Sequence, residues 1–316
     1  MKSPQSTEVE VSQPSSEMRR RWVESRQAKE SAIGNMPGNS RLDKVFGKII
    51  STTFLASGLY HWGKRNSLAV RLKEIELELP TLPEAFDGYR ILHLTDLHLD
   101  ALPELLEPVA CYLEGQEFNL CAMTGDYRES LYASESEYIP HLEALLQGVK
   151  SQDGIFATLG NHDSYTVEPA LERLGVQVLT NATVRLVRGE SCIAVTGVDD
   201  PSYFSSDIAL EVIRANQHPC NILLAHAPEL ADDAARSGYA LYLTGHTHGG
   251  QIAYPGGRPI ITRSSCRREM AVDLWREGNM VGYTSCGLGV GIPPVRFNTR
   301  GELTVFVLRR QRLQAE

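Results

Sequence analysis

Long hydrophobic runs, closely spaced cysteine pairs and sequence repeats are all missing from this 316-residue chain. No run of about 18 uncharged apolar residues occurs, so the sequence contains no clear membrane-spanning helix. None of the six cysteines forms a Cys-x-x-Cys pair, which argues against a zinc ribbon or a thioredoxin-type redox site. Glycine and proline follow no fixed period, which excludes collagen-like and repeat architectures. The composition is that of an ordinary globular protein.

Positive charge is scarce in most of the chain, whose net charge is −8 at pH 7. Residues 1–65 hold eleven Lys and Arg against six Asp and Glu, so residues 66–316 carry a net charge of −13. A body this acidic binds nucleic-acid backbones poorly, and we do not expect nucleic acid as a partner. Such a charge suits a site that collects divalent cations.

The N-terminal 65 residues differ from the rest. Residues 1–44 are polar with no apolar period, which predicts a disordered polar and basic tail. In residues 45–65, Phe46, Ile49, Ile50 and Phe54 recur at helical spacing between flanking Lys and Arg residues. Two interpretations remain open: a helix packed on the body, or an amphipathic helix on an anionic membrane surface. Cysteines in apolar runs are typical of buried, reduced thiols, so we expect a cytoplasmic protein, peripheral on the inner membrane face under the second interpretation.

Residues 66–316 alternate between strand and helix patterns and are predicted to form one α/β domain. Short apolar or period-two segments read as strands, and most are followed by a helical pattern. The main predicted strands are residues 72–79, 90–95, 119–124, 155–159, 221–225, 241–244, 282–285 and 303–308. Alternating elements first and strands last predict a core of two β-sheets with helices outside.

Five of these strands are immediately followed by residues of the types that bind metals. The segments are Asp96-Leu97-His98, Gly125-Asp126, Gly160-Asn161-His162-Asp163, His226 and Gly245-His246-Thr247-His248. Because the carboxyl ends of strands in α/β sheets share one edge, we expect these side chains to meet. Two Asp, one Asn and four His make seven ligands, whereas one zinc ion takes four at most. Seven ligands with one bridging carboxylate suit two ions.

This motif series resembles that of the calcineurin-like metallophosphoesterase superfamily, over about residues 68–310. The loops at 245–252, 225–229, 285–289 and 294–297 are similar to a bacterial membrane-associated branch of it. That branch includes UDP-2,3-diacylglucosamine hydrolase-type enzymes of lipid A biosynthesis. The resemblance implies a four-layer αββα sandwich, which agrees with the element order above.

The resemblance also implies a role for each site residue. It implies a first metal bound by Asp96, His98 and His248, a second bound by Asn161, His226 and His246, and a bridging Asp126. His162 would act on the substrate, by stabilising the transition state or protonating the leaving oxygen, and Asp163 would orient His162. We expect manganese, although imidazole and carboxylate ligands also suit iron, zinc and cobalt. Arg128 is open to two interpretations, a phosphate clamp or an exposed loop arginine.

The expected activity is two-metal phosphoester hydrolysis by a hydroxide held between the ions. The expected substrate is an amphiphilic or lipid-linked phosphodiester or pyrophosphate, such as UDP-2,3-diacylglucosamine. One alternative is a soluble phosphodiesterase for a cyclic nucleotide or another small phosphodiester. A second alternative is a non-catalytic binding scaffold, against which the retention of all seven ligands and His162 argues.

Overall fold

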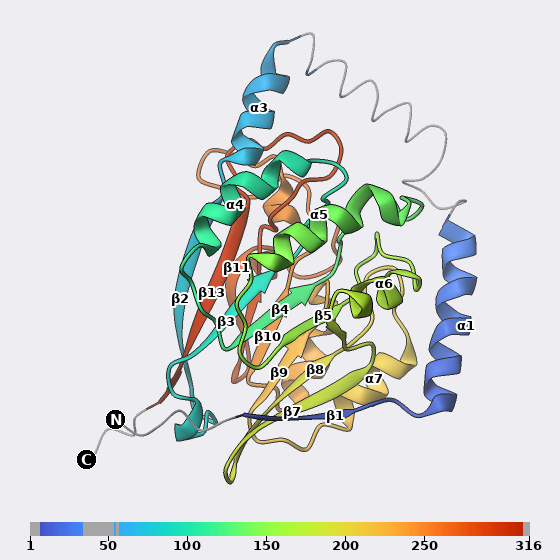
Figure 1. Cartoon of the computed structure of the whole chain (residues 1–316), viewed down its shortest axis with the longest axis vertical. Coiled ribbons are helices and arrows are strands. Elements are labelled where there is room, and N and C mark those ends of the chain that lie inside the picture. The colour runs from blue at the N-terminus through green and yellow to red at the C-terminus, as the bar shows by residue number, and fades with distance from the viewer. Residues whose placement is uncertain (1–6, 34–53, 55–56, 312–316) are drawn as a thin grey trace.

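The computed structural model describes residues 7–33, 54 and 57–311, and two β-sheets form its centre (Figure 1). The first sheet has the order β2-β13-β3-β4-β5-β6 and the second β1-β7-β8-β9-β10-β12-β11. Both sheets are mixed, with parallel strands at their centres. The strands of the first sheet are β2 (Arg71–Leu79), β3 (Tyr89–Leu94), β4 (Leu120–Thr124), β5 (Ile155–Thr158), β6 (Gln177–Val178) and β13 (Glu302–Arg310). Those of the second are β1 (Glu8–Ser12), β7 (Ala182–Arg188), β8 (Ser191–Gly197), β9 (Asn221–Leu224), β10 (Leu241–Thr244), β11 (Asp273–Glu277) and β12 (Met280–Thr284).

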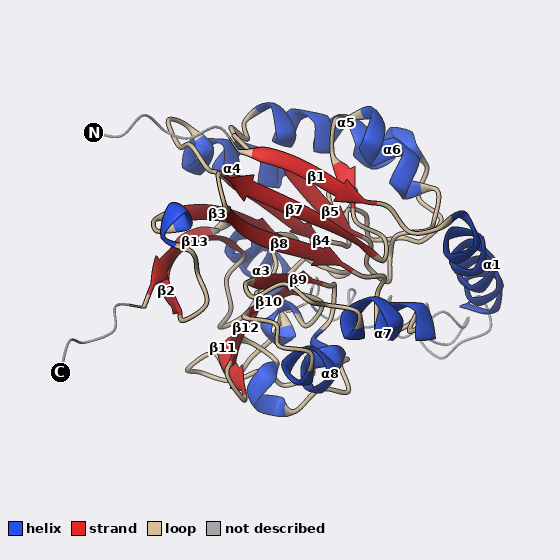
Figure 2. Cartoon of the chain, turned by 90° about the horizontal axis from the view of Figure 1, so that it is seen from below, coloured by secondary structure: helices blue, strands red, loops and turns tan. Residues whose placement is uncertain are grey.

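Helices cover the outer faces of both sheets, as the turned view shows (Figure 2). Helices α4 (Leu106–Leu113), α5 (Glu135–Gln147) and α6 (Val167–Arg173) cover the first sheet. Helices α7 (Asp207–Arg214) and α8 (Ala231–Arg236) cover the second. The predicted four-layer αββα sandwich is therefore confirmed.

Three apolar layers hold the sandwich together, and each central strand contributes to two of them. In β9, Ile222 and Leu224 face the space between the sheets, while Leu223 faces the outer helices. Successive side chains of a strand point to opposite faces, so a strand covered on both faces is apolar throughout. This explains why the central strands appear in the sequence as continuous apolar runs.

The N-terminal residues correct one prediction, because much of the expected disordered tail is ordered. Strand β1 pairs antiparallel with β7 at the edge of the second sheet, with Glu8 opposite Val187. Helix α1 (Ser16–Ile33) follows, and its Trp22 and Arg26 are almost completely buried. The helix contributes one buried Trp and a buried arginine rather than an apolar stripe. A search for apolar periodicity therefore cannot detect it.

The predicted amphipathic segment at 45–65 lies partly outside the described residues, which leave out 34–53 and 55–56. The described part includes the start of helix α3 (Leu59–Leu68). The rings of Phe54 and Trp62 lie against Phe297, with centroids 5.5 and 5.3 Å from it. Trp62 is nevertheless half exposed. Among the residues that the structure describes, none of the helices is both long and apolar enough to cross a membrane.

Candidate metal centre

The five predicted ligand segments meet between the two sheets, at the carboxyl ends of the strands that precede them. Several of these residues have a left-handed backbone, which costs a residue with a side chain on the order of 1–3 kcal/mol. Their φ angles are 51° at Asp96, 41° at His98, 58° at Asp126, 70° at His246 and 52° at His248. The sharp bends turn side chains from neighbouring loops toward one point. Strain concentrated in this way is typical of functional sites.

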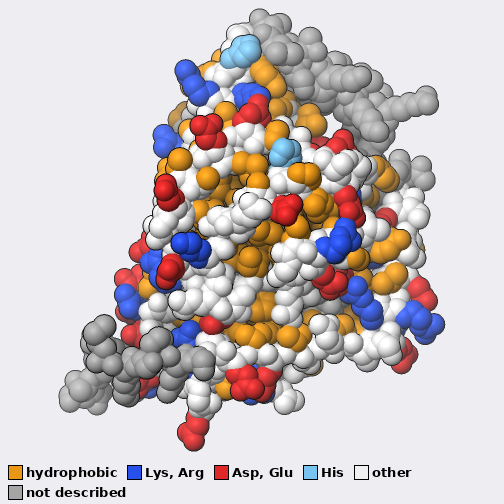
Figure 3. All heavy atoms as spheres, in the orientation of Figure 1, with side chains coloured by type: hydrophobic (Ala, Val, Ile, Leu, Met, Phe, Trp, Pro, Cys, Tyr) orange, Lys and Arg blue, Asp and Glu red, His pale blue; other side chains and the backbone are white. Residues whose placement is uncertain are grey.

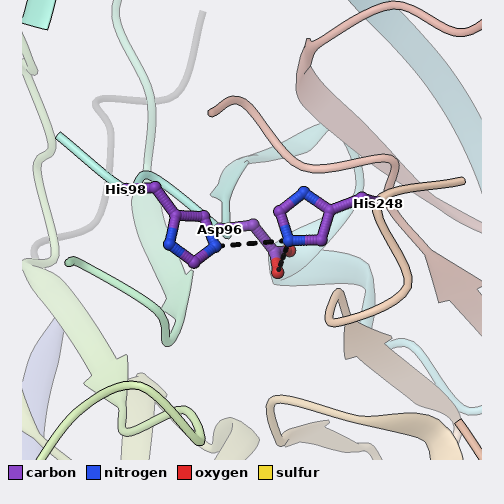
Figure 4. A group of neighbouring side chains, drawn as sticks. All are labelled: Asp96, His98 and His248. Carbon is purple, nitrogen blue, oxygen red and sulfur yellow. Dashed lines mark hydrogen bonds and ion pairs between the residues drawn. The ribbon is translucent and has the colours of Figure 1, made fainter. Parts of the chain in front are cut away.

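Asp96, His98 and His248 form one group, in which all three donor atoms lie within 4.8 Å of one another (Figure 4). The Nε2 atoms of the two imidazoles are 3.2 Å apart. Nε2 of His248 is 3.3 Å from a carboxylate oxygen of Asp96. These are the three side chains expected to bind the first metal.

Asn161, His226 and His246 form a second group around the Asn161 side-chain oxygen. That oxygen is 3.0 Å from Nε2 of His226 and 2.9 Å from Nδ1 of His246. Asp126 lies between the two groups, because its Oδ2 is 3.2 Å from Nε2 of His226 and 3.6 Å from Nε2 of His98. Asp96 is also close to this side, since its donor atom lies within 4.8 Å of those of Asp126 and His226.

Backbone carbonyls orient three of the four imidazoles. Each accepts a hydrogen bond from an outer ring nitrogen: from His98 Nδ1 to Arg128 (3.1 Å), from His226 Nδ1 to Thr124 (2.7 Å) and from His246 Nε2 to Arg263 (3.1 Å). A carbonyl only accepts, so these outer nitrogens carry hydrogen and the opposite nitrogens face the centre. This is the arrangement that metal-binding histidines use.

The donor set fits cations, since acceptor atoms face one another at short range. Nδ1 of His246 is 3.3 Å from Nε2 of His226, and both are close to the Asn161 oxygen. Acceptors this close repel one another unless a positive charge lies among them. Either a proton on His226 or a bound cation can supply it. Imidazole, amide and carboxylate donors together suit divalent transition metals.

Burial and neighbouring charges set the protonation states of the ligand residues. Burial lowers the pKa of His98 to about 3, so its imidazole is neutral and available as a ligand. Burial likewise holds the pKa of His248 well below its usual value. Burial also opposes charge on His226 and Asp126, but their mutual attraction raises the pKa of His226 and lowers that of Asp126. A metal ion would displace the proton that His226 holds without metal.

His162 lies at the open side of the centre, with its side chain about one-third exposed. Its Nε2 is 4.0 Å from Oδ2 of Asp126, and its ring meets that of His98 edge-on, with centroids 5.2 Å apart. Its Nδ1 donates to the backbone carbonyl of Glu129. The resemblance implied that the Asp163 carboxylate orients the His162 ring. In the structure the partner of the ring is the Glu129 carbonyl instead.

Asp163 instead ties two ligand loops together. Its fully buried carboxylate accepts hydrogen bonds from the backbone N–H groups of Asp126 (2.7 Å), Gly160 (2.8 Å) and Tyr127 (3.1 Å). Both carboxylate oxygens are occupied in this way, so neither is left for the imidazole of His162. A carboxylate that accepts several N–H groups fixes a loop firmly.

Two buried arginines also hold the loops, and sequence reasoning had not found either role. Arg128 is buried rather than exposed, and it donates to the carbonyls of His162 (3.1 Å) and Ala133 (2.8 Å). Arg296 is fully buried and donates to the carbonyls of His248 (3.0 Å) and Cys286 (2.7 Å). In a sequence, an arginine beside a metal-binding motif is as consistent with binding the substrate as with holding a loop in place. The sequence carries no signal that separates the two.

One glycine near the centre is required by close packing. A Cβ atom at Gly287 would lie 2.6 Å from the Cβ of Asp96, much closer than real Cβ atoms approach. The loop that begins after β12 therefore lies directly against a ligand residue. Gly287 belongs to the 285–289 segment, which the sequence singled out without a role.

The chain is similar in sequence to known metallophosphoesterases. Residues 89–250, just over half of the chain, match the family model described as calcineurin-like phosphoesterase. The uncharacterized metallophosphoesterase YkuE of Bacillus subtilis is 28% identical, over 85% of this chain and 96% of that protein. YkoQ of the same organism, also an uncharacterized metallophosphoesterase, is 28% identical over 76% of this chain and 91% of that protein.

A third relative comes from a vertebrate. The transmembrane protein with metallophosphoesterase domain of Danio rerio is 27% identical, over 76% of this chain and 57% of that protein. The family match spans all five ligand segments. The chain therefore belongs to the calcineurin-like phosphoesterase family and is a metallophosphoesterase, a hydrolase of phosphoester bonds that works with divalent metal ions.

Proposed function

We propose that this enzyme hydrolyses a phosphodiester or pyrophosphate bond with two divalent cations, manganese first among them. One observation supports this most: donor atoms from five separate loops converge, with hydrogen-bonded carbonyls turning the imidazoles inward. We assign the first ion to Asp96, His98 and His248, the second to Asn161, His226 and His246, and Asp126 to both. When bound, such ions lower the pKa of a water molecule and offset the charge that develops on phosphorus oxygens.

We assign the proton transfer to His162. The Glu129 carbonyl accepts a hydrogen bond from Nδ1–H of His162, so Nε2 faces the open side of the centre near Asp126. When protonated, Nε2 can donate to the leaving oxygen or to a phosphoryl oxygen of the transition state. Asp163 keeps its loop in register with that of Asp126, so the proton donor stays at a set distance from the centre.

For the substrate we propose a lipid-linked diphosphate, with UDP-2,3-diacylglucosamine as the specific case, at the inner membrane face of the cytoplasm. Support comes from exposed apolar side chains next to the site. Ile292 is 62% exposed and its backbone contacts the Glu129 carboxyl group, while Tyr132, 71% exposed, lies three residues beyond Glu129. Trp62 is exposed on α3, and Figure 3 shows basic side chains beside apolar ones at that end of the molecule.

Metal-dependent hydrolysis tests the reaction class. The full-length protein would be stripped with EDTA, reloaded with Mn, Fe, Zn or Co, and assayed on bis(p-nitrophenyl) phosphate and p-nitrophenyl phosphate. We expect two Mn equivalents per chain and cleavage of the diester. Full activity of Asp126→Ala, or at most one equivalent at saturating Mn, would contradict the two-metal assignment.

UDP-2,3-diacylglucosamine and a cyclic nucleotide, assayed side by side, test the substrate. Cleavage of the first alone supports the lipid-linked class, and cleavage of the cyclic nucleotide alone replaces it with a small-molecule phosphodiesterase. Membrane attachment is tested by co-sedimentation with anionic vesicles at low salt. Leu59→Ser with Trp62→Ser should weaken binding, whereas Leu274→Ser, an exposed leucine on edge strand β11, should not.

A further inference from the structure

The N-terminal arm, residues 7–33 with β1 and α1, lies outside the residues that match the family model. Helix α1 stands along one flank of the molecule, beside α6 and α7 (Figure 1). One arginine on this helix, Arg26, is 1% exposed. Burying a guanidinium costs desolvation free energy, which only well-placed hydrogen-bond partners can offset. The partners of Arg26 therefore indicate its role.

The partners of Arg26 are the backbone of the loop that carries Asn161 and His162. Nη2 donates to the carbonyl of Gly160 at 2.8 Å and to that of Asp163, the two ends of the Gly-Asn-His-Asp motif. One turn further along α1, Glu30 accepts a hydrogen bond from the backbone N–H of Tyr165 at 2.8 Å. Helix α1 thus grips three backbone groups of one short loop.

The rest of the guanidinium is held with equal care. Nη1 pairs with the Asp199 carboxylate, and the guanidinium carbon lies over the Phe204 ring, 3.4 Å from its centroid. Asp199 is itself fixed by Trp22 Nε1 at 2.6 Å and by the backbone N–H of Asp200 at 2.9 Å. Only a planar fork of donors can reach a carboxylate on one side and two carbonyls on the other. A lysine ammonium has no such fork.

We propose that Arg26 is a positioning residue of the active site, which sets the place of Asn161 and His162 through the backbone of their loop. The inner side of this loop is held by Asp163 and Arg128, and Arg26 holds its outer side. Without the outer hold, the loop can move away from Asp126, whose Oδ1 accepts the His162 backbone N–H at 2.9 Å. The N-terminal arm then completes the catalytic centre from outside the family domain. This inference rests on the assignment of Asn161 and His162 under the proposed function.

The test removes the Arg26 guanidinium and neutralises the buried carboxylate that pairs with it. Arg26→Met combined with Asp199→Asn takes out the guanidinium and neutralises its carboxylate, while the asparagine oxygen can still accept from Trp22. The matched control is Arg19→Met with Glu168→Gln, which removes another ion pair of α1, 2.7 Å long, that does not touch the loop. Each pair is measured in full-length protein for kcat and KM on bis(p-nitrophenyl) phosphate, for Mn binding by calorimetry, and for Tm.

We expect the Arg26 pair to lower kcat, and the affinity for one of the two Mn ions, by about 10–100-fold, as loss of an outer support of a metal site does. KM and the other Mn site should be unchanged, and the control pair should keep wild-type kcat. Arg26→Lys should not restore kcat. Arg26→Ala leaves a guanidinium-sized cavity beside Asp199, so millimolar guanidinium should recover activity.

Unchanged kcat and Mn binding in a folded Arg26 pair would overturn the inference, and so would an equal loss in the control pair. If the variant had a lower Tm but a normal kcat at temperatures below that Tm, Arg26 would have a purely structural role. This result would also overturn the inference. If the wild type itself bound no Mn and cleaved no diester, the proposed function would fail instead. The two failures are therefore distinguishable.

Discussion

Replacing Asp163 with asparagine probes how firmly the ligand loops must be tied together. Two backbone N–H groups, of Asp126 at 2.7 Å and Gly160 at 2.8 Å, bond to one carboxylate oxygen, and that of Tyr127 at 3.1 Å bonds to the other. In its better orientation the asparagine oxygen keeps the first two bonds. Its amide group then faces the N–H of Tyr127, donor against donor.

The magnitude follows from that count. Hydrogen bonds to a charged group contribute about 1.5–3 kcal/mol each, and a buried donor left without an acceptor costs about 1–3 kcal/mol. Asp163→Asn loses one bond, weakens two by removing the charge, and leaves one donor unpaired. We therefore expect the free energy of unfolding to fall by about 3–5 kcal/mol. The loop connection also loosens, so kcat at saturating Mn should fall as well.

Urea unfolding in EDTA measures the change in stability. A separate assay of Mn-dependent hydrolysis of bis(p-nitrophenyl) phosphate measures the change in kcat. Asp153→Asn is the matched control, because the Asp153 side chain is 7% exposed and accepts the Tyr89 hydroxyl at 2.7 Å before strand β5, at the end of that strand opposite the ligand loop. We expect it to lose stability and keep kcat. The reasoning would be refuted if Asp163→Asn unfolded within about 1 kcal/mol of wild type, the contribution of one ordinary hydrogen bond.

Further predictions concern the proton donor, a buried histidine and the N-terminal arm. His162→Ala should lower kcat by roughly 10²-fold or more with both Mn ions still bound; loss of Mn by calorimetry would make His162 a ligand instead. Burial lowers the pKa of His93 to about 3 from 6.5, so only the unfolded chain takes up its proton between these values and stability falls as pH falls below 6.5. Relative to His93→Gln, wild type in EDTA should lose about 1.2 kcal/mol of unfolding free energy from pH 6 to pH 5. Urea unfolding measures this, and parallel curves for the two proteins would contradict it. A chain shortened to begin at residue 66 loses buried Trp22 and Arg26 and should show a lower Tm and lower kcat than full-length protein; equal values would show that the arm is dispensable.

The sequence alone predicted a two-sheet core with helices outside and the residues that meet at its centre. Continuous apolar strands such as Asn221–Leu224 can only be covered on both faces, which calls for helices outside two sheets. Side chains placed directly after parallel strands come together because those strand ends share an edge. Both inferences need only local order along the chain, since sheet geometry supplies the rest.

Contacts between residues far apart in the chain were decided by tertiary structure. Strand β1 pairs with a strand that begins at Ala182, and Arg26 reaches the carbonyl of Gly160, so nothing near either residue in the sequence reveals its partner. Backbone carbonyls, present at every residue, orient His162 and the ligand imidazoles, and no motif can mark which carbonyl is used. The same holds for Arg128 and Arg296, because an arginine that binds substrate and one that holds a loop look alike until the fold brings their partners together.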